Sequence, residues 1–366
     1  MRVPFVDLTA QYQATREAVD NAIQAVVASG TFIHSAPVNQ FESAWAQAIG
    51  CNHAIGVANG TDALFAILRS LHIGAGDEVI TPAWSWISSA ETISLTGAKP
   101  VFADVDPGTF TLAPHDVALK ITPRTKALVV VHLYGAVADM PALQAIAKAN
   151  GLWIIEDCAQ AHLSTAHGAT AGSFGVASAF SFYPTKNLGA MGDAGAVLTH
   201  DADLAVRIRR FVNHGGLTKD EHLVPGINSR LDALQASILL AKLPQLPAWN
   251  AQRKRHAAHY QARLAHLTAL QLPAVTEGHT VHLFVVRCHR RNELQAHLQA
   301  HGVSTHVHYP SAIPFEPAYA SFGHQLADFP VSAKLQQHVL SLPVYPELSD
   351  EQVDYVCDCI QHFYER

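Results

Sequence analysis

Residues 180–189 read Phe-Ser-Phe-Tyr-Pro-Thr-Lys-Asn-Leu-Gly and place a lysine directly after a run typical of a buried strand. Lys186 follows Pro184, which rigidifies the turn, and most of its other neighbours are apolar or small. Lysines are mostly surface charges, so this apolar setting favours a functional amine. Twenty-nine residues earlier, another predicted buried strand ends in Asp157.

The amine and the acid together indicate a type of chemistry. Pyridoxal phosphate (PLP) needs a primary amine that forms a Schiff base and a carboxylate that keeps its pyridine nitrogen protonated. We expect Lys186 and Asp157 in these two positions, and Gln160 could hydrogen-bond the ring hydroxyl. The alternative for a lone strand-end aspartate is a cap on the next helix.

A phosphate site is predicted at Asn59–Leu64, which joins a predicted strand to an amphipathic helix. Gly60 allows close backbone approach, Thr61 offers a hydroxyl, and the free amides of a helix start attract a phosphate. Ser181, on the strand before the lysine, could donate to the same phosphate. The alternative is an ordinary N-cap formed by Thr61 or Asp62.

Two further patterns are candidate sites. Trp86 follows the predicted strand 78–81, where an aromatic ring can stack on a flat cofactor, although core packing is the alternative. His306 and His308 share one face of a predicted strand, but no third ligand has suitable spacing. We therefore predict no metal site.

Composition excludes several classes of protein. The 366 residues are 49% hydrophobic and 15% charged, which is typical of a well-buried globular protein. The net charge of −6 gives no support for nucleic acid or an anionic membrane as a partner. Five cysteines without zinc-type spacing indicate reduced thiols and a cytoplasmic location, and no apolar run reaches transmembrane length.

The order of predicted elements indicates an α/β fold. Short apolar strands alternate with helices through the first half of the chain, which predicts a mostly parallel central sheet covered on both sides. The predicted strands are 54–58, 78–81, 100–103, 127–133, 152–155, 177–182 and 195–199. The composition changes near Pro244, after which we expect a smaller α+β domain; the predicted domains are 1–245 and 246–366. The predicted elements of the smaller domain are helices at 249–267, 292–301, 332–340 and 350–364 and strands at 281–287 and 304–308.

Taken together, these residues resemble the DegT/DnrJ/EryC1/StrS family of PLP-dependent sugar aminotransferases. The similarity runs nearly the whole length in ordered motifs, at 4–8, 59–64, 76–82, 131–135, 156–162, 181–189, 228–232, 308–310 and 341–343. The resemblance implies the type I (aspartate aminotransferase) fold of PLP-dependent transferases, with a large cofactor-binding domain and a smaller C-terminal domain.

The resemblance also implies roles for individual residues. Lys186 would bind the cofactor covalently and move protons. The implied cofactor-binding residues are Gly60, Thr61, Trp86, Asp157, Gln160, Ser181, Lys186 and Asn228. Asn228 would reach the phosphate from a second subunit, so the resemblance implies a homodimer with shared active sites. The implied substrate-binding residues are Tyr183, Arg230, His308 and Tyr309.

The expected reaction moves an amino group from L-glutamate to a keto nucleotide sugar. Residues 228–236 look most like the branch that aminates C3 of dTDP-3-oxo-6-deoxyhexoses, whereas members acting at C4 of UDP-linked sugars more often carry an aromatic where Ser229 stands. The alternatives are C4 amination of a UDP- or dTDP-4-keto sugar and, from another class, a PLP-bound regulatory protein without turnover. A dehydratase of the same fold is disfavoured, because the known type has histidine at the position of Lys186.

Overall fold

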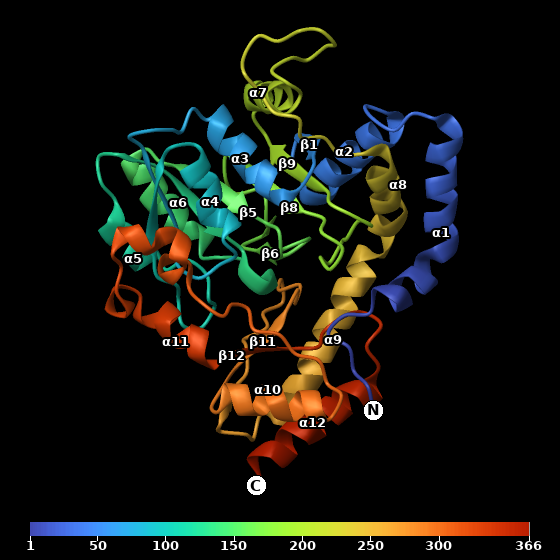
Figure 1. Cartoon of the computed structure of the whole chain (residues 1–366), viewed down its shortest axis with the longest axis vertical. Coiled ribbons are helices and arrows are strands. Elements are labelled where there is room, and N and C mark those ends of the chain that lie inside the picture. Colours follow the sequence, from blue (N-terminus) through green and yellow to red (C-terminus); the bar gives the residue numbers. More distant parts are fainter. Residues whose placement is uncertain (366) are drawn as a thin grey trace.

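A seven-stranded sheet forms the centre of the computed structural model, which describes residues 1–365 (Figure 1). The strand order is β1-β9-β8-β5-β4-β2-β3. The strands are β1 (His53–Val57), β2 (Glu78–Pro82), β3 (Lys99–Ala103), β4 (Thr125–Val131), β5 (Trp153–Asp157), β8 (Ala177–Ser181) and β9 (Gly195–Thr199). Neighbours from β3 to β8 pair in parallel, and only β9 runs antiparallel to its neighbours. The predicted mostly parallel sheet is confirmed.

The direction of β9 decides where the functional loops meet. Because β9 is antiparallel to both β8 and β1, strand β1 runs in the same direction as β8. The carboxyl ends of β1, β5 and β8 therefore lie at one edge of the sheet, which is where open α/β sheets bind ligands. Asp157 ends β5, Ser181 ends β8, and Asn59 follows β1 at this edge.

Alternating side chains along the strands bury both faces of the sheet. In β4, Val129 packs in the same cluster as residues of α3 and α7, whereas Leu128 and Val130 pack with residues of α5 and α6. Phe180 of β8 packs against α2 and α8 in a further cluster. The helices of this part are α1 (Leu8–Ser29), α2 (Ala36–Ile49), α3 (Gly60–Ser70), α4 (Ser88–Leu95), α5 (Pro114–Lys120), α6 (Met140–Asn150), α7 (Ala202–Val212) and α8 (Ala233–Lys242).

The C-terminal part is built on a three-stranded antiparallel sheet, ordered β10-β11-β12. Helix α9 runs from beside α8 down to this sheet in Figure 1. The elements are α9 (Leu246–Leu264), β10 (Leu270–Gln271), β11 (Phe284–Cys288), α10 (Arg291–Ala300), α11 (Pro330–His338), β12 (Val339–Leu342) and α12 (Asp350–Tyr364). Val3 also joins this part through a bridge to Val303. The division at 245 stays a prediction.

Several short elements complete the described chain. Strands β6 (Thr165–Ala166) and β7 (Ala169–Thr170) form a small hairpin. The 3-10 helices are η1 (Leu133–Gly135), η2 (Leu243–Gln245), η3 (Ile313–Phe315), η4 (Pro317–Phe322) and η5 (Leu326–Asp328). None of the helices among residues 1–365 is both long and apolar enough to cross a bilayer.

Some predicted elements were wrong. Residues 304–308 form no strand and contribute only a bridge between His306 and Ser341. The strand forms instead at Val339–Leu342, where a helix was predicted to continue to 340. Pairing with β11 buries Leu340 and Leu342 completely, so tertiary pairing outweighs the local helical pattern there.

Candidate active site

Lys186 lies in the loop after β8 and is half-buried. Burial lowers the pKa of its amine from 10.5 to about 8, against the opposing effect of the Asp157 carboxylate. Burial in turn raises the pKa of Asp157, while the backbone amide of Ala159 and the charge of Lys186 counteract that rise. The structure thus brings the predicted amine and acid within electrostatic reach of each other, and a substantial part of the amine is neutral near pH 8.

Gly60 and Ser181 are pressed together at the same edge of the sheet. A Cβ atom added at Gly60 would lie 2.7 Å from the Cβ atom of Ser181, closer than carbon atoms pack. The hydroxyl oxygen of Ser181 accepts a hydrogen bond from the Tyr183 amide at 3.3 Å, which leaves its own proton to donate. The missing side chain at position 60 therefore brings a helix start and a serine hydroxyl side by side.

The start of α3 is capped by a residue that was not predicted to do so. The side chain of Asn59 accepts from the Asp62 amide at 2.8 Å, so the alternative in which Thr61 or Asp62 forms the cap was wrong. Helix geometry leaves the amides of Gly60 and Thr61 without intrahelical acceptors. The Thr61 hydroxyl lies 2.8 Å from that of Ser88. This helix start can receive an anion.

Gln160 is fixed by two tyrosines. Its Oε1 accepts from the Tyr134 amide at 2.7 Å, and its Nε2 donates to the Tyr309 hydroxyl at 3.0 Å. One Nε2 hydrogen remains for another acceptor. Tyr134 has a left-handed backbone (φ 59°), and its hydroxyl donates to the His308 carbonyl and accepts from Trp84. Tyr134 was missed as an individual site residue, although it lies in a motif that carried the family resemblance.

Aromatic rings stand beside Gln160. The Trp86 ring lies 6.0 Å from that of Tyr309 and is 60% exposed, whereas Trp84 is buried. Trp86 is therefore free to stack on a flat ligand, and the core-packing alternative applies to Trp84 instead. The His308 ring bonds the Ser341 hydroxyl at 2.8 Å, and burial, with the charges of His306 and Lys186, lowers the pKa of His308 to about 4. His308 is thus neutral near pH 7.

The residue after the lysine anchors its loop. Asn187 is buried and uses its whole side chain, because Nδ2 donates to Asn250 Oδ1 at 2.8 Å and to the Thr280 carbonyl at 3.1 Å. Its Oδ1 lies 2.9 Å from Nδ1 of His282. Asn250 in turn donates to the carbonyl of His162. Sequence reasoning missed this set, and the only signal was the place of Asn187 in the lysine motif.

The remaining predicted residues lie toward the surface. Asn228 is exposed and pairs with Asn213, and Arg230 is half-buried. Between them, Ser229 is fully buried; its hydroxyl donates to Asp62 at 2.7 Å and accepts from the Ala58 amide at 3.1 Å. Ser229 thus ties this loop to the start of α3, while its neighbours stay available to solvent or a partner. Tyr183 is also exposed.

A buried acid supports the strand that carries Asp157. Glu156 accepts from His132 Nε2 at 2.9 Å and from the amides of Gly172, Phe174 and Gly175 at 2.7–2.8 Å. His132, Glu156 and Cys158 have potential metal-ligand atoms within 4.8 Å of one another. His132 Nδ1 accepts from the Ala138 amide at 3.2 Å, so the His132 ring and the carboxylate already have protein partners.

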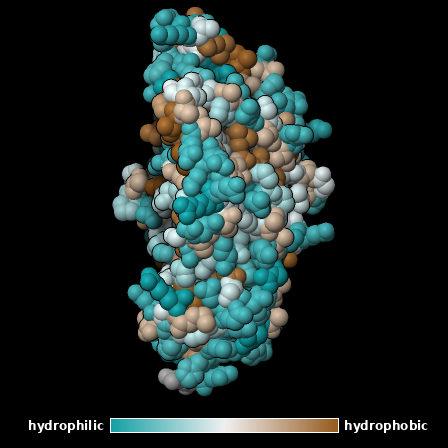
Figure 2. All heavy atoms as spheres, turned by 90° about the vertical axis from the view of Figure 1, so that its right-hand side faces the viewer, coloured by the Kyte–Doolittle hydropathy of each residue, from teal (hydrophilic) through white to brown (hydrophobic). Residues whose placement is uncertain are grey.

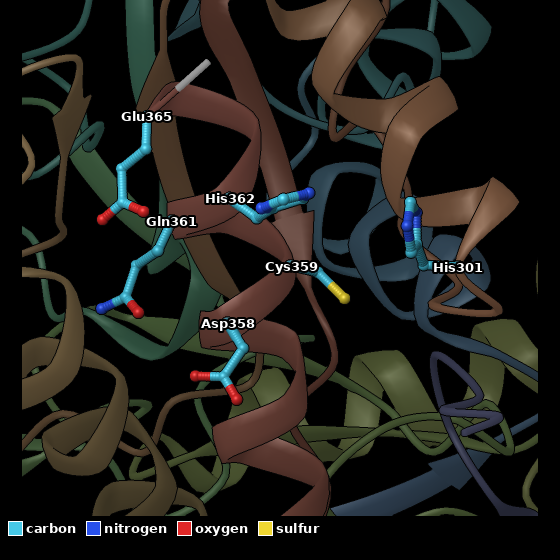
Figure 3. Close-up of a pocket in the computed structure, with 6 residues that line it drawn as sticks. All are labelled: His301, Asp358, Cys359, Gln361, His362 and Glu365. Atoms are coloured by element: carbon cyan, nitrogen blue, oxygen red, sulfur yellow. The ribbon is translucent and has the colours of Figure 1, made fainter.

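A surface cavity of about 360 Å³ lies beside α12, away from these residues in the chain (Figure 3). Figure 3 shows His362 and Cys359 on the side of α12 toward His301, and Gln361 and Glu365 on the opposite side. None of the predicted site residues lines it.

The fold and the site define an α/β enzyme in which a half-buried lysine lies within electrostatic reach of a strand-end carboxylate. The chain belongs to the DegT/DnrJ/EryC1/StrS aminotransferase family, whose profile matches residues 13–361. The predicted family and the predicted enzyme class are confirmed.

Named relatives cover nearly the whole chain. A dTDP-3-amino-3,4,6-trideoxy-alpha-D-glucose transaminase of Streptomyces venezuelae is 44% identical over 100% of this chain and 97% of its own. A UDP-N-acetyl-3-dehydro-alpha-D-glucosamine 3-aminotransferase of Acidithiobacillus ferrooxidans is 42% identical over 98% of this chain and 97% of its own. A pleiotropic regulatory protein of Geobacillus stearothermophilus is 42% identical over 100% and 99%.

Solved structures agree with the fold. DesV of S. venezuelae, crystallised in complex with a ketimine intermediate, has a TM-score of 0.97 and 43% identity over 100% of this chain and 99% of that chain. The protein ntda of Bacillus subtilis, with bound cofactor PMP, has a TM-score of 0.93 and 31% identity over 100% and 86%. The predicted fold class is confirmed.

Proposed function

We propose that this protein transfers an amino group from L-glutamate to the keto group of a nucleotide sugar, with PLP as its cofactor. The observation that carries the proposal is the meeting of Lys186, Asp157 and the Gly60–Ser181 contact at one edge of the sheet. The family match and the PMP-bound neighbour confirm the predicted cofactor.

The residues present fit PLP. The free amides of Gly60 and Thr61 and the Ser181 hydroxyl are donors suited to its phosphate. Asp157 is a buried acid that gains a positive partner when the pyridine nitrogen is protonated. Gln160 keeps one hydrogen for the ring hydroxyl, and the exposed face of Trp86 suits the ring itself. We propose these residues as the cofactor site.

When bound, PLP supplies an aldehyde carbon and a ring that withdraws electrons from the reacting bond. Lys186 supplies the amine that attaches the cofactor, and because its pKa is about 8, a substantial fraction of this amine is neutral near pH 8. The same nitrogen, once free, can accept a proton and deliver it to a neighbouring atom. Asn187 holds the loop still during these transfers.

For the substrate, we propose amination at C3 of a dTDP-3-oxo-6-deoxyhexose. Both named transferase relatives above carry the amino group at C3 in their names, one on a dTDP sugar and one on a UDP sugar. The higher identity to the dTDP enzyme and the hydroxyl at Ser229 support a dTDP sugar as the substrate. Amination at C4 of a UDP- or dTDP-4-keto sugar is the alternative. Tyr183, Arg230, His308 and Tyr309 are proposed to contact the substrates.

We propose that the protein works as a homodimer in the cytoplasm. The proposed role of Asn228 at the phosphate site of a second chain requires an accessible side chain, and Asn228 is exposed. Apolar residues remain exposed around this loop and the ends of α1 and α2, namely Val27, Phe32, Ile33, Leu217, Leu223 and Val224. Figure 2 shows apolar surface in the upper half of the face that carries α1. Five buried free cysteines support a reducing compartment.

A PLP-bound regulatory protein without turnover is the second candidate, because one relative is named a pleiotropic regulatory protein. The presence of Lys186, Asp157 and Gln160 together favours the enzyme. One assay separates the two: L-glutamate is added to the holoenzyme while its visible cofactor absorbance is recorded. We expect the absorbance to fall, and to recover when a dTDP-3-keto sugar is added. An absorbance that glutamate leaves unchanged contradicts the aminotransferase.

Recovery of the absorbance also tests the substrate. A C3-keto dTDP sugar, a C3-keto UDP sugar and a C4-keto sugar are compared at equal concentration. We expect the absorbance to recover fastest with the C3-keto dTDP sugar. Faster recovery with a C4-keto sugar contradicts the proposed position, and Lys186→Ala, which cannot form the covalent link, serves as the inactive control.

A further inference from the structure

A second cavity, of about 490 Å³, lies between the β10–β11 edge and α11. Its volume falls in the range of about 300–1,000 Å³ that is typical of small-molecule sites. Four of its eleven lining residues have basic side chains, namely Arg287, His289, Lys334 and His338. No carboxylate lines it among the described residues. We call it the α11 pocket.

Arg287 is the residue that indicates an anion site in this cavity. Its guanidinium lies over the Phe110 ring, with Cζ 5.4 Å from the ring centroid. Its Nε is buried and, within residues 1–365, has no hydrogen-bond acceptor. A guanidinium is planar and carries a fork of N–H groups, which can bind a carboxylate or phosphate through two hydrogen bonds.

The nearest acid does not neutralise this group by contact. The charge of Asp106 acts on Arg287, but no ion pair within 4.0 Å joins them in the part of the chain that the structure describes. Asp106 Oδ1 instead accepts from the amides of Gly108 and Thr109 in its own loop. The guanidinium therefore has hydrogen-bonding capacity to spare.

The opposite wall adds further donors. Lys334 is exposed on α11, and His338, one turn later, donates from Nδ1 to the Lys334 carbonyl at 2.8 Å. This bond orients the His338 ring, 6.2 Å from the ring of His289. Val331 and Leu335 provide an apolar surface beside them. The pocket thus combines a planar guanidinium, an exposed lysine and an apolar wall.

We propose that the α11 pocket binds a small phosphate-bearing anion, with Arg287 as the bidentate partner and Lys334 as the second charge. This site shares no residue with the proposed active site, so it stands independently of the proposed function. The apolar wall suits an organic group attached to the phosphate.

The test is a calorimetric titration of the PLP-loaded enzyme with inorganic phosphate and, separately, phenyl phosphate, at ionic strength held constant with sodium chloride. We expect saturable binding by the wild type and at least tenfold weaker binding by Arg287→Gln. Lys334→Glu changes an exposed residue and therefore keeps the fold, and it should also weaken binding. Lys148→Glu, an exposed lysine on α6 with the same charge change, should bind as the wild type does.

Arg230→Gln distinguishes binding in the α11 pocket from binding in the proposed active site. Binding that survives this change and is lost in Arg287→Gln or Lys334→Glu supports the α11 pocket. Absence of saturable binding overturns the proposal, and so does binding that Arg230→Gln abolishes while the two pocket variants retain it. If Arg287→Gln does not fold, the titration of Lys334→Glu decides whether phosphate binds in the α11 pocket. Tighter binding of phenyl phosphate than of inorganic phosphate identifies an organic phosphate, and equal binding identifies the free anion.

Discussion

Nδ1 of His282 donates a hydrogen bond of 2.9 Å to Oδ1 of Asn187, the residue next to Lys186. Burial and the nearby charge of Lys186 lower the pKa of His282 well below its ordinary value, so the ring is neutral and its Nδ1 hydrogen is committed to this bond. The bond joins the lysine loop of the central sheet to the segment that leads into β11. The position of Lys186 therefore depends on residues almost a hundred positions later in the chain.

Replacement of Asn187 by alanine should destabilise the protein. The change leaves His282 Nδ1, Asn250 Oδ1 and the Thr280 carbonyl without a buried partner, which costs about 2–4 kcal/mol. Denaturant unfolding of the apoprotein measures this loss, and kcat should fall more than KM rises because the lysine loop is no longer held. Asn150→Ala, at an exposed asparagine, should change stability by less than about 0.5 kcal/mol. Equal stability of the two variants would show that the network is not needed.

The rate at which the apoenzyme takes up PLP should depend on pH through Lys186. Only the neutral amine attacks an aldehyde, so the rate should rise with pH and level off near the pKa of about 8. Because the Asp157 carboxylate raises the pKa of this lysine, Asp157→Asn should move the break to lower pH. Stopped-flow absorbance measures both profiles. A break near 10.5, the ordinary value for lysine, would contradict the burial of the amine.

Gly60→Ala should weaken cofactor binding. The new methyl group would lie 2.7 Å from the Cβ atom of Ser181, and overpacking of this kind costs about 1–3 kcal/mol. Since about 1.4 kcal/mol is tenfold in affinity, we expect the Kd for PLP to rise at least about fivefold. Gly74→Ala is the matched control, because its Cβ atom would lie 3.5 Å from the Thr96 carbonyl, an ordinary contact. Fluorescence titration of the two apoproteins with PLP measures both Kd values, and equal values would contradict the prediction.

Glu156→Gln should unfold at lower denaturant concentration although it keeps the shape of the side chain. Four donors point at the Glu156 carboxylate, and an amide group would present its own hydrogens to some of them. We expect a loss of about 2–4 kcal/mol, in the range for a broken buried network. Glu17→Gln on the exposed face of α1 should be neutral. An unchanged midpoint in Glu156→Gln would refute the buried-anchor interpretation.

Local sequence patterns predicted most of the central sheet. All seven predicted strands exist with ends shifted by at most two residues, because each is a short apolar run buried on both faces. The predicted lysine and acid lie near each other because both follow strands whose carboxyl ends share one edge. The roles assigned to the site residues stay predictions.

The missed residues share a physical reason. Tyr134, Asn187 and Ser229 act through hydrogen bonds to residues 26 to 174 positions away in the chain, and no local pattern marks such partners. The failure at 304–308 has the same origin, since β12 forms only because β11 offers it an edge.

The sequence by itself determined the alternation of buried strands and helices, the lysine loop and the strand-end acid, because these follow from side-chain periodicity and from residue types at fixed spacing. Only the tertiary structure decided the antiparallel direction of β9, the clamp on Asn187 and the free guanidinium of Arg287. Those features depend on which distant groups satisfy, or fail to satisfy, a buried donor or acceptor, and that choice is made by packing.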